Sequence, residues 1–173
     1  MMGRILMSAL MAMVPVVAGA IPLVGLYQTI DDETGRARSI VALYEYADDA
    51  GRETLGGRVV ALYDDSGNIS ETPDNATRVA SKVAGKPTVV GMDIIWTMHW
   101  DADKNQYSGG NIMDPANGKV YGSVIWRDGE SLNVRGKIGP FGRTQKWVPV
   151  AAADAPASLQ NLDTSNWKPI IRK

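Results

Sequence analysis

Residues 127–138 read RDGESLNVRGKI and contain the clearest local structure in the chain. The last eight residues alternate between apolar or small residues (Leu132, Val134, Gly136, Ile138) and polar ones (Ser131, Asn133, Arg135, Lys137). A period of two is typical of a strand with one buried and one solvated face. The Asp-Gly pair directly before the strand favours a tight turn, because both residues accept positive φ. This stretch therefore predicts an antiparallel hairpin with one apolar side.

Outward from this hairpin, the chain contains seven more short runs of strand type and no long run with the 3.6-residue apolar period of a helix. The eight expected strands span residues 24–30, 38–46, 55–63, 92–100, 105–113, 119–127, 131–138 and 143–149. Turn sequences at 31–35 and 114–119 join neighbouring strands as further hairpins. The pattern predicts an all-β meander that forms either a sandwich or an up-and-down barrel.

Two segments of the chain depart from this pattern. Residues 64–91 are rich in polar side chains, and we expect a short helix or lid there, within 75–85, capped by Asp74 or Asn75. The tail, residues 151–173, begins with alanine and proline and ends with Trp167 and two isoleucines. We expect this tail to dock loosely on the outside of the sheet or to be partly disordered.

The first twenty residues, MMGRILMSALMAMVPVVAGA, have the order of a secretory signal peptide: an early cation at Arg4, an apolar stretch, and small residues up to Ala20. We expect cleavage after Ala20, and hence a periplasmic or extracellular protein. The rival interpretation is an uncleaved membrane anchor, because no charge follows Arg4 until Asp31. The expected organisation is a leader at 1–20, a barrel domain at 21–150 and a tail at 151–173.

Composition narrows the classes of function. With 173 residues the chain fits one domain, and its formal charge of −1 without a basic run makes nucleic acid an unexpected partner. The sequence has no cysteine and one histidine, which rules out disulfides and thiolate or histidine-rich metal sites. We therefore expect no cofactor and no metal.

Three local features invite a functional interpretation, and for each the structural interpretation is preferred. His99 has no carboxylate or nucleophile at a recognisable spacing, so we do not expect an enzyme. The carboxylates of residues 31–33 are enough to attract calcium, but solvated turn carboxylates are commoner. The pair Gly109-Gly110 lies inside an expected strand, where it should bend the strand for closure.

If the meander closes, its first and last strands pair, and Tyr27 and Arg143 are then expected to meet at one end. A guanidinium over the tyrosine ring would close that end of the barrel by a cation–π contact.

Several of these segments together resemble a known family. GLYQTIDDETGRARSIV at 25–41, YSGGNIMDPANGKVYG at 107–122 and LNVRGKIGPFGRTQKW at 132–147, with the leader, are similar to the bacterial exported family called domain of unknown function 2147. The resemblance implies a lipocalin-like barrel of about eight strands outside the cytoplasm, with no established activity. Relatives often have Trp where this chain has Tyr27, and many have a cysteine pair that is missing here. Residues 64–91 therefore lack that constraint.

Two hypotheses about function remain open. The first is a barrel that binds a small apolar or amphipathic ligand in its lumen, because eight strands leave room for one small ligand or for side chains alone. The candidate ligand-binding residues are Tyr27, Tyr44, Trp96, Tyr107, Trp126 and Trp147. The second is a filled barrel that acts as a structural or protein-interaction module of the cell envelope. Contact with a membrane is expected only through an uncleaved leader.

Overall fold

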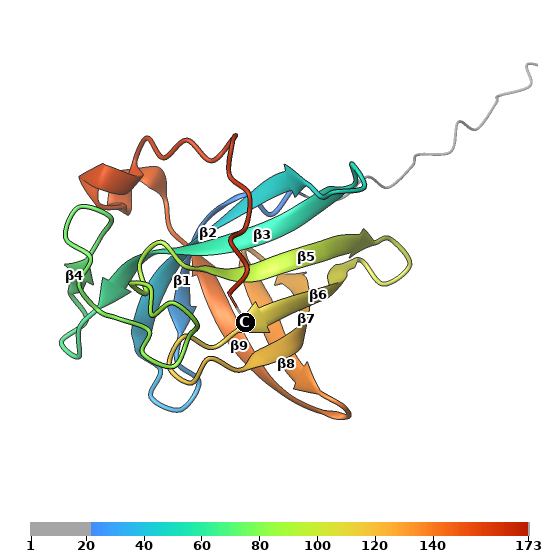
Figure 1. The fold of residues 1–173 in the computed structure, drawn as a ribbon, viewed down its shortest axis with the longest axis horizontal. Coiled ribbons are helices and arrows are strands. Elements are labelled where there is room, and N and C mark those ends of the chain that lie inside the picture. The colour runs from blue at the N-terminus through green and yellow to red at the C-terminus, as the bar shows by residue number, and fades with distance from the viewer. Residues whose placement is uncertain (1–21, 173) are drawn as a thin grey trace, which may run out of the picture.

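The computed structural model describes residues 22–172, which form a closed β-barrel with an attached tail (Figure 1). The expected leader at 1–20, including its signal helix, lies outside the described residues. The strands are β1 (Gly25–Ile30), β2 (Ala37–Ala47), β3 (Glu53–Tyr63), β4 (Ile69–Glu71), β5 (Asp93–Asp101), β6 (Gln106–Met113), β7 (Val120–Asp128), β8 (Ser131–Ile138) and β9 (Phe141–Pro149). Two short 3-10 helices follow, η1 (Ala152–Asp154) and η2 (Ala157–Leu159). Within residues 22–172 no helix has the length and apolarity that crossing a bilayer requires.

All strand pairs are antiparallel, and the eight predicted strands form the barrel wall. The hydrogen-bonded order is β2-β1-β9-β8-β7-β6-β5-β3-β4, and β2 also pairs with β3, which closes the ring and leaves β4 as an appendage of β3. The predicted pairing of the first and last strands is confirmed, since Tyr27 of β1 lies opposite Pro149 of β9. Closure leaves no long unpaired edge, and it decides between the two architectures in favour of the barrel.

The hairpin of β7 and β8 is antiparallel and has the predicted buried face, but its two turn residues are Gly129 and Glu130, since Asp128 lies opposite Ser131. Trp126 lies opposite Asn133, and Ile125 opposite Val134. Leu132 and Val134 are buried, while their neighbours on β8 are only partly buried. The alternation read from the sequence therefore identifies the interior face correctly.

The paired glycines of β6 bend the strand, as predicted. Gly109 has φ of +76°, and the β6–β7 register shifts by one residue between Tyr107 and Gly110. A Cβ on Gly110 would lie 2.4 Å from the Trp96 carbonyl oxygen. Only glycine fits that position, so the pair marks a bulge and a close approach of β5 and β6.

The prediction of a short helix within residues 75–85 is wrong. This part of the segment is a loop with one isolated bridge between Val79 and Thr88. The carboxylate of Glu71 accepts hydrogen bonds from the N–H groups of Thr77 and Arg78, at 2.8 and 2.9 Å. These bonds satisfy the backbone without a helix, and a segment of this length has little helical stability of its own.

The tail lies on the outside of the barrel, as expected, across β2 and β3 (Figure 1). The tail is attached more firmly than the loose docking that we expected. Ala155 and Leu159 are buried against outward-facing side chains of the wall, including Ile40, Ala42 and Val60. The barrel consequently has a second, smaller hydrophobic cluster outside its wall.

Candidate functional site

The barrel interior, where a ligand was expected, is filled by side chains. Trp147, Ile95, Met98, Ile125 and Leu132 are each at most 1 % exposed, and all belong to one hydrophobic cluster. Leu132 lies opposite Trp147 on the neighbouring strand. An eight-stranded barrel is just wide enough for such residues to meet. The interior is therefore a packed core.

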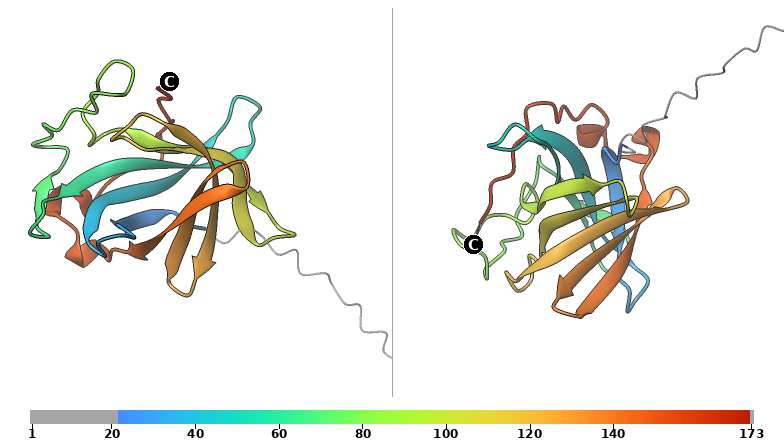
Figure 2. Two further views of the ribbon diagram at one scale, coloured as in Figure 1. Left: turned by 90° about the horizontal axis from the view of Figure 1, so that it is seen from below. Right: turned by 90° about the vertical axis from the view of Figure 1, so that its right-hand side faces the viewer.

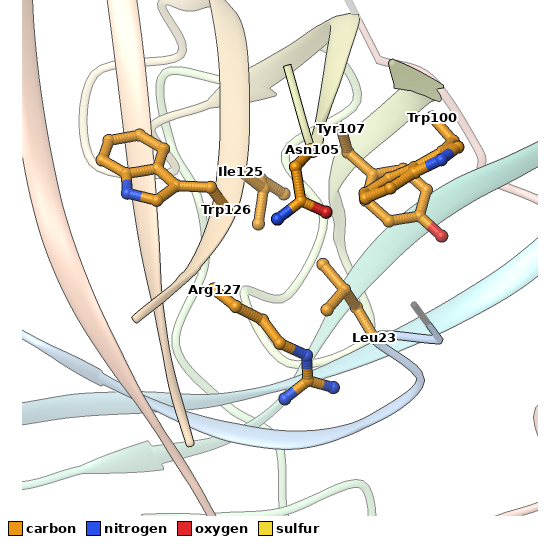
Figure 3. A pocket seen from close by; sticks show the side chains of 7 residues that line it. All are labelled: Leu23, Trp100, Asn105, Tyr107, Ile125, Trp126 and Arg127. Carbon is orange, nitrogen blue, oxygen red and sulfur yellow. The ribbon is translucent and has the colours of Figure 1, made fainter. Parts of the chain in front are cut away.

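One end of the barrel is closed by the residues that precede β1. Leu23 is buried, and Arg127 Nη2 donates to the carbonyl oxygen of Pro22 at 2.9 Å. The cavity that remains there has a volume of about 10 Å³ and is shown in Figure 3. It is lined by Leu23, Trp100, Asn105, Tyr107, Ile125, Trp126 and Arg127. This volume holds about one water molecule and excludes a larger ligand.

Residues 64–92 contribute further side chains to the same core. Val83, Val89, Val90 and Met92 are buried in the interior cluster. The backbone also joins this segment to the wall, because Val59 N–H donates to the Met92 carbonyl oxygen at 2.9 Å. The segment therefore acts as the lid that the sequence suggested, although it does so without a helix.

Four of the six candidate ligand residues lie together, and two lie elsewhere. Tyr27, Trp96, Tyr107 and Trp147 are buried in the interior cluster. Trp126 is directed away from Leu23 and Asn105 in Figure 3, since its neighbour Ile125 occupies the inward position.

Tyr44, the second outlier, is on the outer face of β2 and buried beneath the tail, with its ring 5.3 Å from the ring of Trp167. Two of the six candidate ligand-binding residues, Tyr44 and Trp126, therefore do not face the lumen.

The prediction that Tyr27 and Arg143 are in contact is wrong. Arg143 lies six residues before Pro149, the register partner of Tyr27, which separates the two by roughly 20 Å along the strand. Instead, Arg143 Nε donates to Asp32 at 2.8 Å, and its Nη2 lies 3.2 Å from a Glu33 carboxylate oxygen. The sequence identified the pairing strands but could not fix how far they overlap.

The pKa of Tyr27 reflects its position in the core. Burial raises the pKa of its hydroxyl, and the nearby positive charge of Arg127 offsets part of that effect. Arg127, and not Arg143, is thus the cation that acts on this tyrosine.

The carboxylates considered for calcium stabilise their own turn. Asp31 Oδ1 accepts from the backbone N–H and the hydroxyl of Thr34, both at 2.8 Å, and Arg38 Nε donates to Oδ2 at 3.1 Å. These bonds, chiefly those from Thr34, lower the pKa of Asp31 to about 2. Among residues 22–172 no group of three or more His, Cys, Asp or Glu side chains is arranged so that it could hold a metal ion.

His99 lies on β5 opposite Ser108. Its imidazole has no carboxylate within ion-pair distance in the part of the chain that the structure describes. A general base requires a partner that orients the ring. The expectation that the protein is not an enzyme stays a prediction.

Sequence reasoning missed a charged cluster on the outer wall, which we call the tail clamp: Tyr44, Arg58, Asp93, Trp167 and Ile170. The Asp93 side chain is fully buried and accepts from Tyr44 Oη at 2.8 Å, from Arg58 Nε and Nη2 at 2.9 Å each, and from the Ile170 N–H at 2.8 Å. The Arg58 guanidinium also lies 4.2 Å from the centre of the Trp167 ring. Burial, with a smaller effect of Asp93, raises the pKa of Tyr44 well above its ordinary value.

The tail clamp joins the end of the tail to β2, β3 and β5. Its residues are far apart in sequence, and no short motif connects them. Only the single tryptophan near the end of the tail, Trp167, gave any signal.

Between η1, η2 and the barrel wall lies an apolar groove of about 250 Å³, which we call the outer groove. It is lined by Val24, Gly25, Leu26, Ala42, Leu43, Val150, Ala152, Leu159, Gln160, Leu162 and Thr164. Most of these side chains are aliphatic. This is a far larger space than the cavity at the barrel end, and it lies outside the wall.

The chain is similar in sequence to one known protein family and in fold to a solved structure. The profile of the family described as "uncharacterized protein conserved in bacteria", domain of unknown function 2147, matches residues 25–148. The chain belongs to this family. The match spans the barrel from β1 to the last residues of β9 and stops before the tail. The outer groove and the tail clamp therefore depend partly on residues outside the family's matched region.

A solved structure supports the fold assignment. The protein HP1028 from Helicobacter pylori, described as belonging to the lipocalin family, matches with a TM-score of 0.52 and 17 % identity, over 76 % of this chain and 84 % of that chain. At this identity the likeness concerns the fold alone, and the lipocalin-like barrel is thereby confirmed. No curated protein matches the chain.

Proposed function

We propose that this protein is an exported, filled β-barrel that acts through its outer surface, as a structural or protein-interaction module of the cell envelope. The observation that carries the proposal is the packed interior, where Trp147 and its neighbours occupy the space that a ligand would need. Ligand pockets commonly measure about 300–1,000 Å³. A ligand in this barrel would have to displace several fully buried side chains.

Export is part of the proposal and is supported by the leader. Its early cation, apolar stretch and small residues ending at Ala20 match the order of a signal peptide. Fractionation of the source bacterium, with the mass of the purified chain, tests this part. A mature chain beginning at Ile21 in the periplasm or medium supports it, and a full-length chain in the cytoplasm contradicts it.

A second candidate function is the binding of a small apolar molecule in the outer groove. The volume of about 250 Å³ and the aliphatic lining favour it. This candidate retains a ligand of the expected chemistry but moves the site from the lumen to the outside.

Native mass spectrometry of protein purified from its own envelope separates these possibilities. The first candidate predicts a reproducible protein partner and no bound small molecule. The second predicts a bound small molecule that Ala152→Trp displaces, because Ala152 lines the groove and is exposed. Ala153→Trp is the matched control, since Ala153 is the exposed neighbour that does not line the groove. A bound small molecule that survives Ala152→Trp would contradict both candidates.

A further inference from the structure

The hairpin of β8 and β9 carries an exposed apolar tip. Ile138 and Phe141 lie opposite one another across the two-residue turn Gly139-Pro140, in which Gly139 has φ of +56°. They are 62 % and 79 % exposed. Phe141 is the single phenylalanine of the chain. We call these two side chains the hairpin tip.

The hairpin tip continues the inward face of the barrel beyond the barrel itself. On β8, Leu132 and Val134 on that face are buried, and Ile138, four residues beyond Val134 on the same face, is exposed. The apolar pattern therefore extends further than the core that it serves. Core packing accounts for the first part of the face but not for the tip.

The charge of the hairpin is one-sided. Residues 131–149 contain Arg135, Lys137, Arg143 and Lys146 and no acidic residue, whereas the whole chain has a formal charge of −1. Arg143 contacts two carboxylates of the turn between β1 and β2, and Lys146 Nζ lies 3.9 Å from a carboxylate oxygen of Asp128 at the end of β7. Within residues 22–172, Arg135 and Lys137 have no ion pair. Two cations thus remain available beside the apolar tip.

Part of the negative charge beside the hairpin is offset by Arg143. The β8–β9 hairpin projects beside the turn between β1 and β2, as the right-hand view of Figure 2 shows, and Arg143 there contacts both Asp32 and Glu33. This contact reduces the repulsion that these carboxylates would exert on an anionic surface.

We propose that the hairpin tip docks on an anionic lipid bilayer, with Phe141 and Ile138 entering the boundary between headgroups and acyl chains and with Lys137 and Arg135 contacting lipid phosphates. Aromatic and aliphatic side chains flanked by cations are the chemistry that such a surface recognises. The inference names the partner of the surface activity proposed above and rests on that proposal. It also goes beyond the expectation that only an uncleaved leader would contact a membrane.

Vesicle co-sedimentation of the protein purified from its envelope tests the inference. Phosphatidylcholine vesicles containing phosphatidylglycerol should bind the wild type, and pure phosphatidylcholine should bind it at least about tenfold more weakly, since each basic residue near an anionic surface contributes about 1 kcal/mol. Replacing both Ile138 and Phe141 with Ser should weaken binding by at least about tenfold. Val148→Ser is the matched control, because Val148 is an exposed aliphatic residue of β9 far from the turn. Circular dichroism checks that each variant is folded.

A second readout reports on the hairpin tip itself, and therefore does not depend on whether the leader also binds the vesicles. The chain has no cysteine, so Phe141→Cys can carry a single environment-sensitive fluorophore. Its emission should shift to the blue with phosphatidylglycerol vesicles, and the same probe at Val148→Cys should not shift. Equal shifts at both positions, no shift at Phe141→Cys, or equal binding of wild type and double serine variant would overturn the inference.

These outcomes separate the inference from the function on which it rests. Suppose that the double serine variant still co-purifies with a protein partner and that the wild type does not bind vesicles. The proposed protein-interaction function then stands, and the membrane inference fails. If the vesicle results are as expected but no protein partner is found, the bilayer itself is the partner of the barrel.

Discussion

The two hydrophobic clusters of this barrel differ in how completely they are filled. Inside the wall, one cluster of aliphatic and aromatic side chains leaves a cavity of about 10 Å³ at one end. Outside the wall, the smaller cluster under the tail adjoins a groove of about 250 Å³ and a buried ion pair. The interior has the character of a stabilising core. The outer wall leaves the outer groove open, and its buried polar groups bind the protein's own tail.

The largest expected effect is in the interior. Trp147→Ala removes a side chain that is 1 % exposed and should destabilise the fold by about 3–5 kcal/mol, because the packed wall cannot collapse into the space. Equilibrium urea unfolding measures this. A loss below about 1 kcal/mol would mean that the interior is not packed.

The next effect concerns the tail clamp. Asp93→Ala leaves Arg58 without its carboxylate and should cost about 3 kcal/mol, the lower end of the range for a broken buried pair, because Arg58 is partly solvated. The same unfolding measurement applies. Asp49→Ala, at an exposed turn, is the control and should leave the free energy of unfolding within about 0.5 kcal/mol of wild type.

A smaller effect is expected when only the aromatic contact of the clamp is removed. Trp167→Ala deletes the ring that stacks on Arg58 and should cost about 1–2 kcal/mol. Limited proteolysis should then cut the tail before the barrel, since only the hydrogen bonds of the clamp still hold the end of the tail. Simultaneous cleavage of tail and barrel would indicate that the two clusters form one unit.

The smallest effect belongs to the turn between β1 and β2. The pKa of Asp31 is lowered to about 2 from 3.8, so its contribution to stability is present above about pH 4 and is lost as the pH falls toward 2. Asp31→Asn removes this contribution and should flatten that part of the stability curve. Chemical unfolding between about pH 5 and 2 tests it, as approximate limits set by the two pKa values, and identical slopes for both proteins would contradict the assignment.

The strands could be predicted from the sequence because period-two alternation and turn residues are local signals, whereas closure into a barrel was implied only by the family resemblance. The alternation around Leu132 and Val134 gave both the strand and its inner face. The bulge at Gly109-Gly110 was likewise predictable, since a glycine inside a strand usually marks a bulge or a close approach of another backbone.

The site was less predictable because it depends on faces and on distant contacts. In β2 the run from Ile40 to Tyr44 is apolar at nearly every position, so the sequence could not tell that Tyr44 faces outward. The position of Arg143 depended on strand overlap, and the tail clamp on a contact between β3, β5 and the end of the chain. Whether side chains fill the lumen or leave it open to a ligand depended on packing, which no local sequence pattern encodes.

Diffraction from crystals of the wild-type protein under xenon pressure tests the packed interior most directly, because xenon enters apolar cavities that water leaves empty. A filled barrel predicts no xenon inside the wall of the wild type and one new site in Trp147→Ala. Strong xenon density, or density for an elongated molecule, at the centre of the wild-type barrel would contradict it.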